Sequence, residues 1–141
     1  MSAPQFPRLG ASACIWRDGK VLLVQRGKNP WYGAWSLPGG AVEFGERARD
    51  AAARELMEET GVTADLLRLV DIDDAMLRDG EGAVVSHYAI ACYTGWWVSG
   101  EAVAADDALA VDWLPLADLA SLSMTPGTAA YIETAWNLLN N

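Results

Sequence analysis

Three glutamates within five residues are the part of this 141-residue chain best suited to chemistry. Glu55, Glu58 and Glu59 lie in residues 54–62, where Gly61 is the residue expected just past a helix C-terminus. Side chains three and four positions apart are neighbours on a helix, so the three carboxylates share one face. Hard divalent cations such as Mg²⁺ bind oxygen ligands and keep positions open for water and phosphates. The spacing therefore predicts a metal-binding face.

The same carboxylates oppose folding of the helix. Each like-charge pair costs roughly 0.2–0.5 kcal/mol, and negative charge in the last turn opposes the helix dipole by roughly 0.3–1 kcal/mol more. A bound cation would remove this repulsion. The alternative is a solvated acidic surface on which Arg54 and Glu58 form an ordinary ion pair four residues apart.

The residues before the helix favour the metal-binding interpretation. Pro38, Gly39 and Gly40 predict a tight loop, and Glu43, Gly45 and Glu46 follow it. Here the chain resembles the Nudix hydrolases, whose signature is Gly, five residues, Glu, seven residues and then REUXEEXGU, with U aliphatic. All nine specified positions of the signature are filled across residues 40–62, namely by Gly40, Glu46, Arg54, Glu55, Leu56, Glu58, Glu59, Gly61 and Val62.

This resemblance implies a metal centre. Its ligands would be Glu55, Glu58, Glu59 and the backbone carbonyl of Gly39, and its ion would be Mg²⁺, with Mn²⁺ as the alternative. Arg54 would orient a carboxylate. The implied catalytic residues are therefore Glu55, Glu58 and Arg54, while Glu46 either supports a ligand or simply favours the helix N-terminus.

The resemblance also implies a reaction, the attack of water on phosphorus in a nucleoside diphosphate linked to another group. Many relatives supply a further acid from a late loop. In this chain residues 99–107 form that loop, with Glu101, Asp106 and Asp107 as candidates, and we favour Asp107 as a catalytic residue. A metal lowers the pKa of its bound water, which a carboxylate can then help to deprotonate.

Three residues outside the signature are predicted to bind substrate. Arg26 ends a predicted strand, where it could meet phosphates, whereas the neighbouring Lys28 is better explained as surface charge. Trp31 and Trp35 cluster in the segment that enters the glycine loop, where an indole ring could stack on a base. The single histidine, His87, is assigned a structural role.

The remaining elements are predicted from turn signals and apolar patterns. Residues 9–16 and 20–26 form a hairpin around Asp18 and Gly19. A short extended segment at 34–37, a helix at about 47–60 and strands at 63–74, 83–98 and 111–114 follow, with 83–98 placed centrally. Pro115 begins a short helical turn through Leu119, and a last helix runs from Pro126 to about Leu139. We expect an α/β fold, an α/β/α sandwich of the Nudix type with a mixed sheet.

Length and composition predict one domain over residues 1–141. With 52% hydrophobic and 21% charged residues, the chain can bury a core. No apolar run is long enough to span a bilayer and the N-terminus lacks signal-peptide features, so we expect a cytoplasmic protein without a membrane partner. Cys14 and Cys92 are predicted to be reduced core residues.

The charge distribution bears on the partners. The net charge is −9, and residues 79–141 contain no Lys or Arg, so a nucleic acid polymer is excluded as a partner. A small nucleotide remains the predicted partner. A homodimer is compatible with the apolar segment around Trp96 and Trp97, which would serve equally well as a central strand.

The sequence leaves the substrate class open. ADP-ribose or nucleotide sugars are favoured over nucleoside triphosphates. One type of ADP-ribose pyrophosphatase is marked by a proline beyond the signature, and this chain lacks it, since no proline lies between Pro38 and Pro115. A Nudix module that senses nucleotides without turnover is the alternative of another class. Such modules usually lose signature glutamates, and this chain retains all of them.

Overall fold

Strand β1 is the centre of the structure, a computed structural model that describes residues 5–141. Its residues Gly10–Trp16 are buried, as expected for a nearly continuous apolar run in the middle of a sheet. The elements, in chain order, are β1 (Arg8–Arg17), β2 (Lys20–Arg26), β3 (Trp35–Ser36), β4 (Gly39–Ala41), α1 (Ala48–Thr60), β5 (Thr63–Arg78), β6 (Val84–Ser99), β7 (Ala108–Pro115), the 3₁₀ helix η1 (Leu116–Ser121) and α2 (Thr128–Asn140).

The sheet is mixed, as predicted. Strand β1 runs parallel to β6 and antiparallel to β2 and β4, and the main strand order is β3-β2-β1-β6-β5. Strand β6 therefore lies inside the sheet, between β1 and β5, which confirms its predicted interior position.

The predicted hairpin forms, but its two strands soon separate. Asp18 and Gly19 both have positive φ, as a type I′ turn requires, yet β1 and β2 pair only next to this turn. Further along β1, Gly39–Ala41 pairs with it instead. The prediction of a plain tight loop at these glycines is therefore wrong, because their backbone fills the edge of β1 that β2 leaves.

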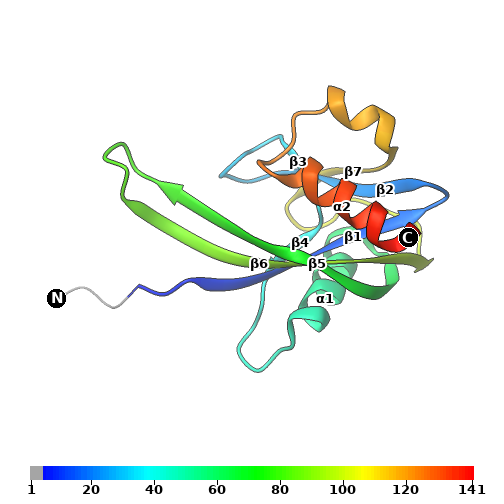
Figure 1. Ribbon diagram of the computed structural model, residues 1–141, viewed down its shortest axis with the longest axis horizontal. Coiled ribbons are helices and arrows are strands. Elements are labelled where there is room, and N and C mark those ends of the chain that lie inside the picture. The colour runs from blue at the N-terminus through cyan, green and yellow to red at the C-terminus, as the bar shows by residue number, and fades with distance from the viewer. Residues whose placement is uncertain (1–4) are drawn as a thin grey trace.

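Strands β5 and β6 form a long antiparallel ribbon, and the end of this ribbon projects away from the rest of the molecule (Figure 1). Strand β5 continues to Arg78, four residues beyond the predicted end at Asp74. The reason is its partner, since pairing with β6 persists as far as Arg78 and Val84.

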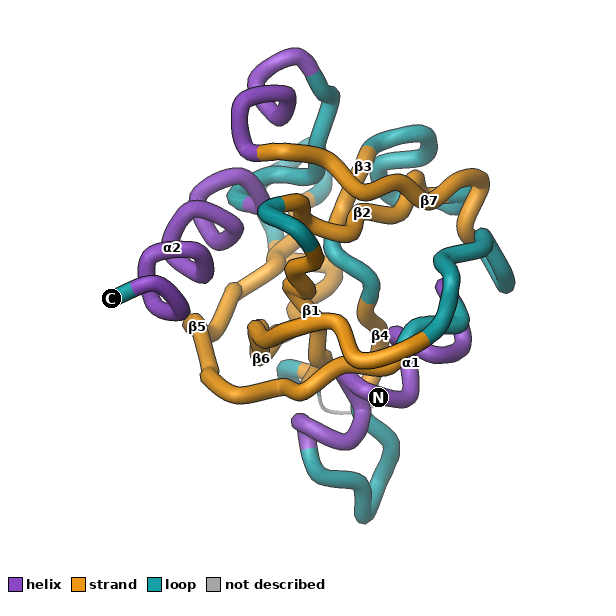
Figure 2. Tube along the Cα trace, turned by 90° about the vertical axis from the view of Figure 1, so that its right-hand side faces the viewer, coloured by secondary structure: helices purple, strands orange, loops and turns teal. Residues whose placement is uncertain are grey.

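One long helix covers each face of the sheet (Figures 1 and 2). Helix α1 ends at Gly61, whose φ of 74° allows its amide to donate to the carbonyl of Met57. Helix α2 begins two residues later than predicted, because Gly127 has a φ of 81° and interrupts the helix start after Pro126. The two helices bury separate hydrophobic clusters against β1, and the predicted α/β/α sandwich is confirmed.

Both cysteines are free and buried, as predicted. Burial raises the pKa of the Cys14 thiol and raises the pKa of Cys92 to about 11, so neither is a reactive thiolate near neutral pH. In the part of the chain that the structure describes, no helix has both the length and the apolar character to cross a membrane.

Candidate metal and catalytic site

Helix α1 places the acidic face beside the glycine strand β4. The Gly39 amide donates a 2.8 Å hydrogen bond to Oε2 of Glu59, 20 residues along the chain. At Gly40 the approach is so close that a Cβ atom would lie 2.6 Å from Oε1 of Glu55. Gly39 and Gly40 therefore let the carboxylates of Glu59 and Glu55 lie directly against the β4 backbone.

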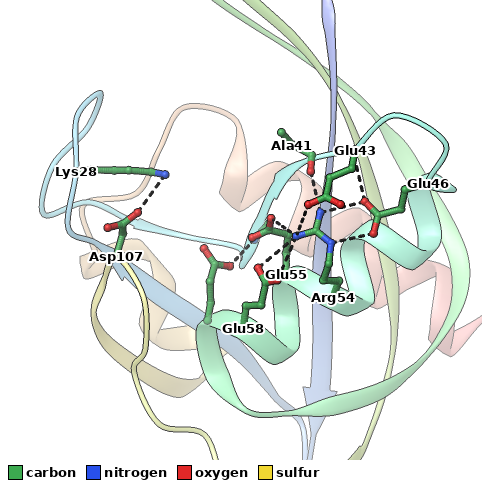
Figure 3. Close-up of polar contacts among 10 residues, drawn as sticks. Lys28, Ala41, Glu43, Glu46, Arg54, Glu55, Glu58 and Asp107 are labelled. Atoms are coloured by element: carbon green, nitrogen blue, oxygen red, sulfur yellow. Dashed lines mark hydrogen bonds and ion pairs between the residues drawn. The ribbon is translucent and has the colours of Figure 1, made fainter.

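Arg54 lies at the centre of the acidic cluster (Figure 3). Its guanidinium contacts the side chains of Glu46 at 2.8 and 3.0 Å, Glu55 at 2.9 Å, Glu58 at 3.2 Å and Glu43 at 3.9 Å, and the carbonyl of Ala41 at 3.0 Å. Arg54 donates one hydrogen bond to each carboxylate oxygen of Glu46. These two bonds are the main reason why the pKa of Arg54 is raised and the pKa of Glu46 is lowered. Glu46 is therefore the main anchor of Arg54, and the ion pair with Glu58 is one of several.

The carboxyl of Glu59 is largely shielded from water. This burial raises the pKa of Glu59 to about 7, the hydrogen bond from Gly39 opposes the rise, and the charge of Glu55 adds to it. A carboxyl group with a pKa this close to neutral pH is suited to a site where a cation compensates the charge of its ionised form.

The residues present fit a hard divalent cation by donor type. Glu55, Glu58 and Glu59 supply oxygen ligands, and the missing side chain at Gly40 makes room for one of these carboxylates against the backbone. In the conformation described for residues 5–141, no three acidic, histidine or cysteine side chains form a ready-made metal cage. Arg54 instead holds the carboxylates of Glu55 and Glu58.

A small pocket extends from this cluster toward the late loop. Gly39 and Glu59 line it together with Arg26, Lys28 and Asp107. The Lys28 Nζ lies 3.4 Å from Oδ2 of Asp107 (Figure 3). A Cβ atom at the neighbouring Gly27 would lie only 2.2 Å from the Asp107 carbonyl oxygen. The structure therefore brings Asp107 and Arg26 to the pocket of Glu59. A larger pocket lies elsewhere, between residues 5–8 and β6.

The predicted substrate-binding residues have different surroundings. Arg26 donates from Nε to the Pro30 carbonyl at 2.8 Å, and Trp31 is half-exposed in the following loop with a φ of 66°. Trp35 packs instead against the hydrophobic cluster under α2. His87, on β6, pairs with Asp74 of the neighbouring strand β5 at 3.1 Å and forms no ion pair or hydrogen bond with the signature carboxylates within residues 5–141.

Sequence reasoning missed two features of the site. Lys28 is exposed, as predicted, yet it also pairs with Asp107 across the pocket, a contact that the sequence does not indicate. Glu43 and the Ala41 carbonyl add to the ring of acceptors around Arg54. The acidic composition of residues 41–46 is a sequence signal for the contacts of this segment with Arg54. The ion pair of Lys28 with Asp107 depends on contact between segments about 80 residues apart, which no local pattern reveals.

The comparisons with known proteins place this chain among hydrolases. A family model described as NUDIX domain matches residues 6–135, and the chain belongs to the Nudix family.

Curated relatives agree with this assignment. The chain is 36% identical over 117 residues to an ADP-ribose pyrophosphatase of Methanocaldococcus jannaschii, covering 83% of this chain and 67% of that protein. It is 32% identical over 116 residues to the uncharacterized Nudix hydrolase YvcI of Bacillus subtilis, covering 82% and 71%.

Solved structures give the same result. A MutT NUDIX hydrolase from Burkholderia pseudomallei superposes with a TM-score of 0.81 at 32% identity, over 92% of this chain and 98% of that one. The NUDIX domain of Shewanella oneidensis NrtR, solved in complex with ADP ribose, has a TM-score of 0.79 at 27% identity, over 96% and 90%.

Proposed function

We propose that this protein is a divalent-metal-dependent pyrophosphohydrolase that cleaves the phosphoanhydride of a nucleoside diphosphate linked to another group. One observation carries the proposal: helix α1 and strand β4 bring Glu55 and Glu59 against the backbone of two adjacent glycines, with Arg54 holding Glu55 and Glu58. Such a concentration of oxygen donors is suited to neutralising phosphoryl charge through a cation.

Glu55, Glu58, Glu59 and the Gly39 carbonyl would hold Mg²⁺, with Mn²⁺ as a second candidate. The ion, when bound, supplies charge neutralisation at phosphoryl oxygens and lowers the pKa of a water ligand. Arg54 fixes the directions of Glu55 and Glu58, and Asp107 accepts a proton from the attacking water. Arg26 binds phosphate at the pocket, and the half-exposed Trp31 stacks on the base.

ADP-ribose is the substrate we favour. A relative 36% identical to this chain is named ADP-ribose pyrophosphatase, and a domain with a TM-score of 0.79 was solved with ADP ribose bound. The active protein is proposed to be a cytoplasmic enzyme formed by one Nudix domain. Nucleotide sugars and nucleoside triphosphates are the competing substrates.

The direct test is a product-release screen with Mg²⁺ over ADP-ribose, nucleotide sugars, dinucleoside polyphosphates and nucleoside triphosphates. We expect turnover of ADP-ribose to AMP and ribose 5-phosphate. The Glu58→Gln variant should lose about 100-fold or more in kcat, because it removes a proposed ligand of the cation, and loss of a group that only orients a ligand already costs about 10–100-fold. Asp50→Asn is the matched control, because Asp50 is an exposed carboxylate in the first turn of the same helix.

Other results of this screen would redirect the proposal. If nucleoside triphosphates were turned over faster than ADP-ribose, they would be the substrate, and the proposed hydrolysis of a phosphoanhydride would stand. Saturable ADP-ribose binding without any turnover would replace the enzyme by a sensing module.

A further inference from the structure

The loop between β6 and β7 carries Asp107 and is fastened to the end of helix α1. The Val103 amide donates to the Thr60 carbonyl at 3.0 Å, and the Ala105 amide donates to the Glu59 carbonyl at 3.0 Å. These carbonyls belong to the last turn of the helix, where acceptors lack partners within the helix. The backbone of residues 100–107 therefore runs past Glu59 before it reaches Asp107.

The start of this loop is held by a second set of contacts. Gly100 has a φ of 94°, and a Cβ atom there would lie 2.3 Å from the Gly61 carbonyl oxygen. The indole Nε1 of Trp97 donates to the Gly100 carbonyl at 2.8 Å. The chain thus reverses tightly against the helix end, with Trp97 fixing the point of reversal.

Arg17, at the end of β1, connects Trp97 to the loop. Its Cζ lies 3.7 Å from the centroid of the Trp97 ring, and its Nη1 lies 3.4 Å from Oε2 of Glu101. Two other arginines stack on aromatic rings in residues 5–141, but at 5.4 and 5.5 Å. Since Glu101 is 81% exposed, its ion pair alone would be weak, and the stacked ring supplies the fixed surface.

The far end of the loop is held by strand β7, since Ala108 pairs with Arg26 of β2 and donates to the Ala105 carbonyl at 3.1 Å. The side chain of Asp107 is held less firmly than this backbone. Asp107 contacts the backbone of Gly27 and pairs with Lys28, but both side chains of that pair are more than 60% exposed. No helix or strand is formed by residues 100–107. Between the reversal at Gly100 and the start of β7, the path of the loop past Glu59 depends on its contacts with α1 and on how the chain leaves Gly100.

We propose that Arg17, Trp97 and Glu101, here called the Arg17 cluster, are positioning residues that set the place of Asp107 relative to Glu59. The inference rests on the proposed function, in which Asp107 accepts a proton from water. None of the three residues touches the substrate. They act through the course of residues 100–107, which the Arg17 cluster fixes at one end and the helix α1 carbonyls fix in the middle.

A double-mutant cycle separates positioning from general stability. Arg17→Ala should lower kcat by about 10-fold or more with a smaller change in KM, because small misplacements of a reacting group are costly. In an Asp107→Asn background, Arg17→Ala should cause no further loss of kcat. Arg8→Ala is the matched control, since it removes the arginine that stacks on Tyr88, away from this loop.

Equal losses of kcat from Arg17→Ala in both backgrounds would overturn the proposal, because the arginine would then act on the whole fold. Full kcat in Asp107→Asn alone would also overturn it, while leaving metal-dependent hydrolysis intact.

A second measurement does not depend on turnover. Hydrogen exchange of the Val103 and Ala105 amides should become faster in Arg17→Ala but not in Arg8→Ala, and Arg17→Lys should fall between the two because lysine stacks less well. Unchanged exchange at both amides in Arg17→Ala would overturn the proposal even if no substrate were found. Faster exchange with no activity in any variant would instead mean that the proposed function is wrong.

Discussion

At the scale of the single residue, the conflict between folding and function is greatest at Glu59. Its carboxyl is shielded from water, accepts one hydrogen bond from Gly39 and lies near the negative charge of Glu55. A residue chosen only for stability would not be ionised there. The acidic face was predicted from spacing alone, but the unequal environments of its three members depend on the β4 backbone, which spacing does not reveal.

The raised pKa of Glu59 predicts a pH-dependent penalty in metal-free protein. The pKa rises from 4.5 to about 7 on folding, so the neutral carboxyl favours the folded state below pH 4.5, and this contribution is lost as pH rises through 7. Between pH 4.5 and 8 the wild type should lose about 3 kcal/mol of unfolding free energy relative to Glu59→Gln. Urea unfolding in EDTA at several pH values measures this difference. Parallel pH profiles for the two proteins would contradict it.

Arg54 leads to a separate prediction about metal affinity. Lysine has one ammonium group and cannot reproduce the bidentate bond to Glu46 together with the contacts to Glu55 and Glu58. Arg54→Lys should therefore weaken Mg²⁺ or Mn²⁺ binding by about 10–100-fold, measured by calorimetry. Arg47→Lys, at an exposed position just before α1, should leave the affinity unchanged. If Arg54→Lys and Arg47→Lys bound the metal with equal affinity, Arg54 would not orient the metal ligands.

At the scale of elements, helix α1 was predictable and strand β4 was not. The helix has its own local signals, including Gly61 just beyond its end, and it begins within one residue of the predicted start. Strand β4 has three residues and exists because β2 turns away from β1. Such a strand is specified by the partner that it meets, so residues 38–41 alone indicated only a turn.

The contact between β4 and α1 can be tested with two glycines of the same segment. At Gly40 an added Cβ would meet the Glu55 carboxylate, whereas at Gly45 it would meet nothing within 4 Å but would strain a φ of 85°. Gly40→Ala should lower metal affinity by about 10-fold with little effect on stability, since only the end of a side chain must move. Gly45→Ala should cost about 1–2 kcal/mol of stability and leave metal affinity unchanged. Calorimetry and urea unfolding on both variants would show whether this crossed pattern occurs.

At the scale of the whole molecule, one buried hydrogen-bond chain joins the two central strands. The Trp16 indole donates to Oγ1 of Thr94 at 3.1 Å, and this hydroxyl donates to the Cys14 carbonyl at 2.7 Å. The sequence predicted a central place for residues 83–98 and core positions for Cys14 and Cys92, but the parallel pairing and register of the two strands emerge only from the assembled sheet. The same holds for the Arg17 cluster, whose members are up to 84 residues apart.

Removing the hydroxyl of Thr94 should affect stability without affecting the site. Thr94→Val keeps the shape of the side chain but leaves the Trp16 N–H without its acceptor, which should cost about 1–3 kcal/mol in thermal or urea unfolding. Thr94→Ser retains the hydroxyl and should cost less. Metal affinity should match the wild type in both variants, and a valine variant as stable as the serine variant would contradict the expected role of this bond.

The parallel pairing of β1 with β6 also determines when this chain can fold during its synthesis. Cys14 and Thr94, which are hydrogen-bonded neighbours, are 80 positions apart. At roughly 5–20 residues per second, β1 must wait about 4–16 s after its own synthesis before its parallel partner exists. Loop closure over that distance must then precede any gain from the contact. Throughout this interval the edge of β1 that later pairs with β6 stays open on the nascent chain. The stage most exposed to aggregation or chaperone binding therefore comes before α2 is made.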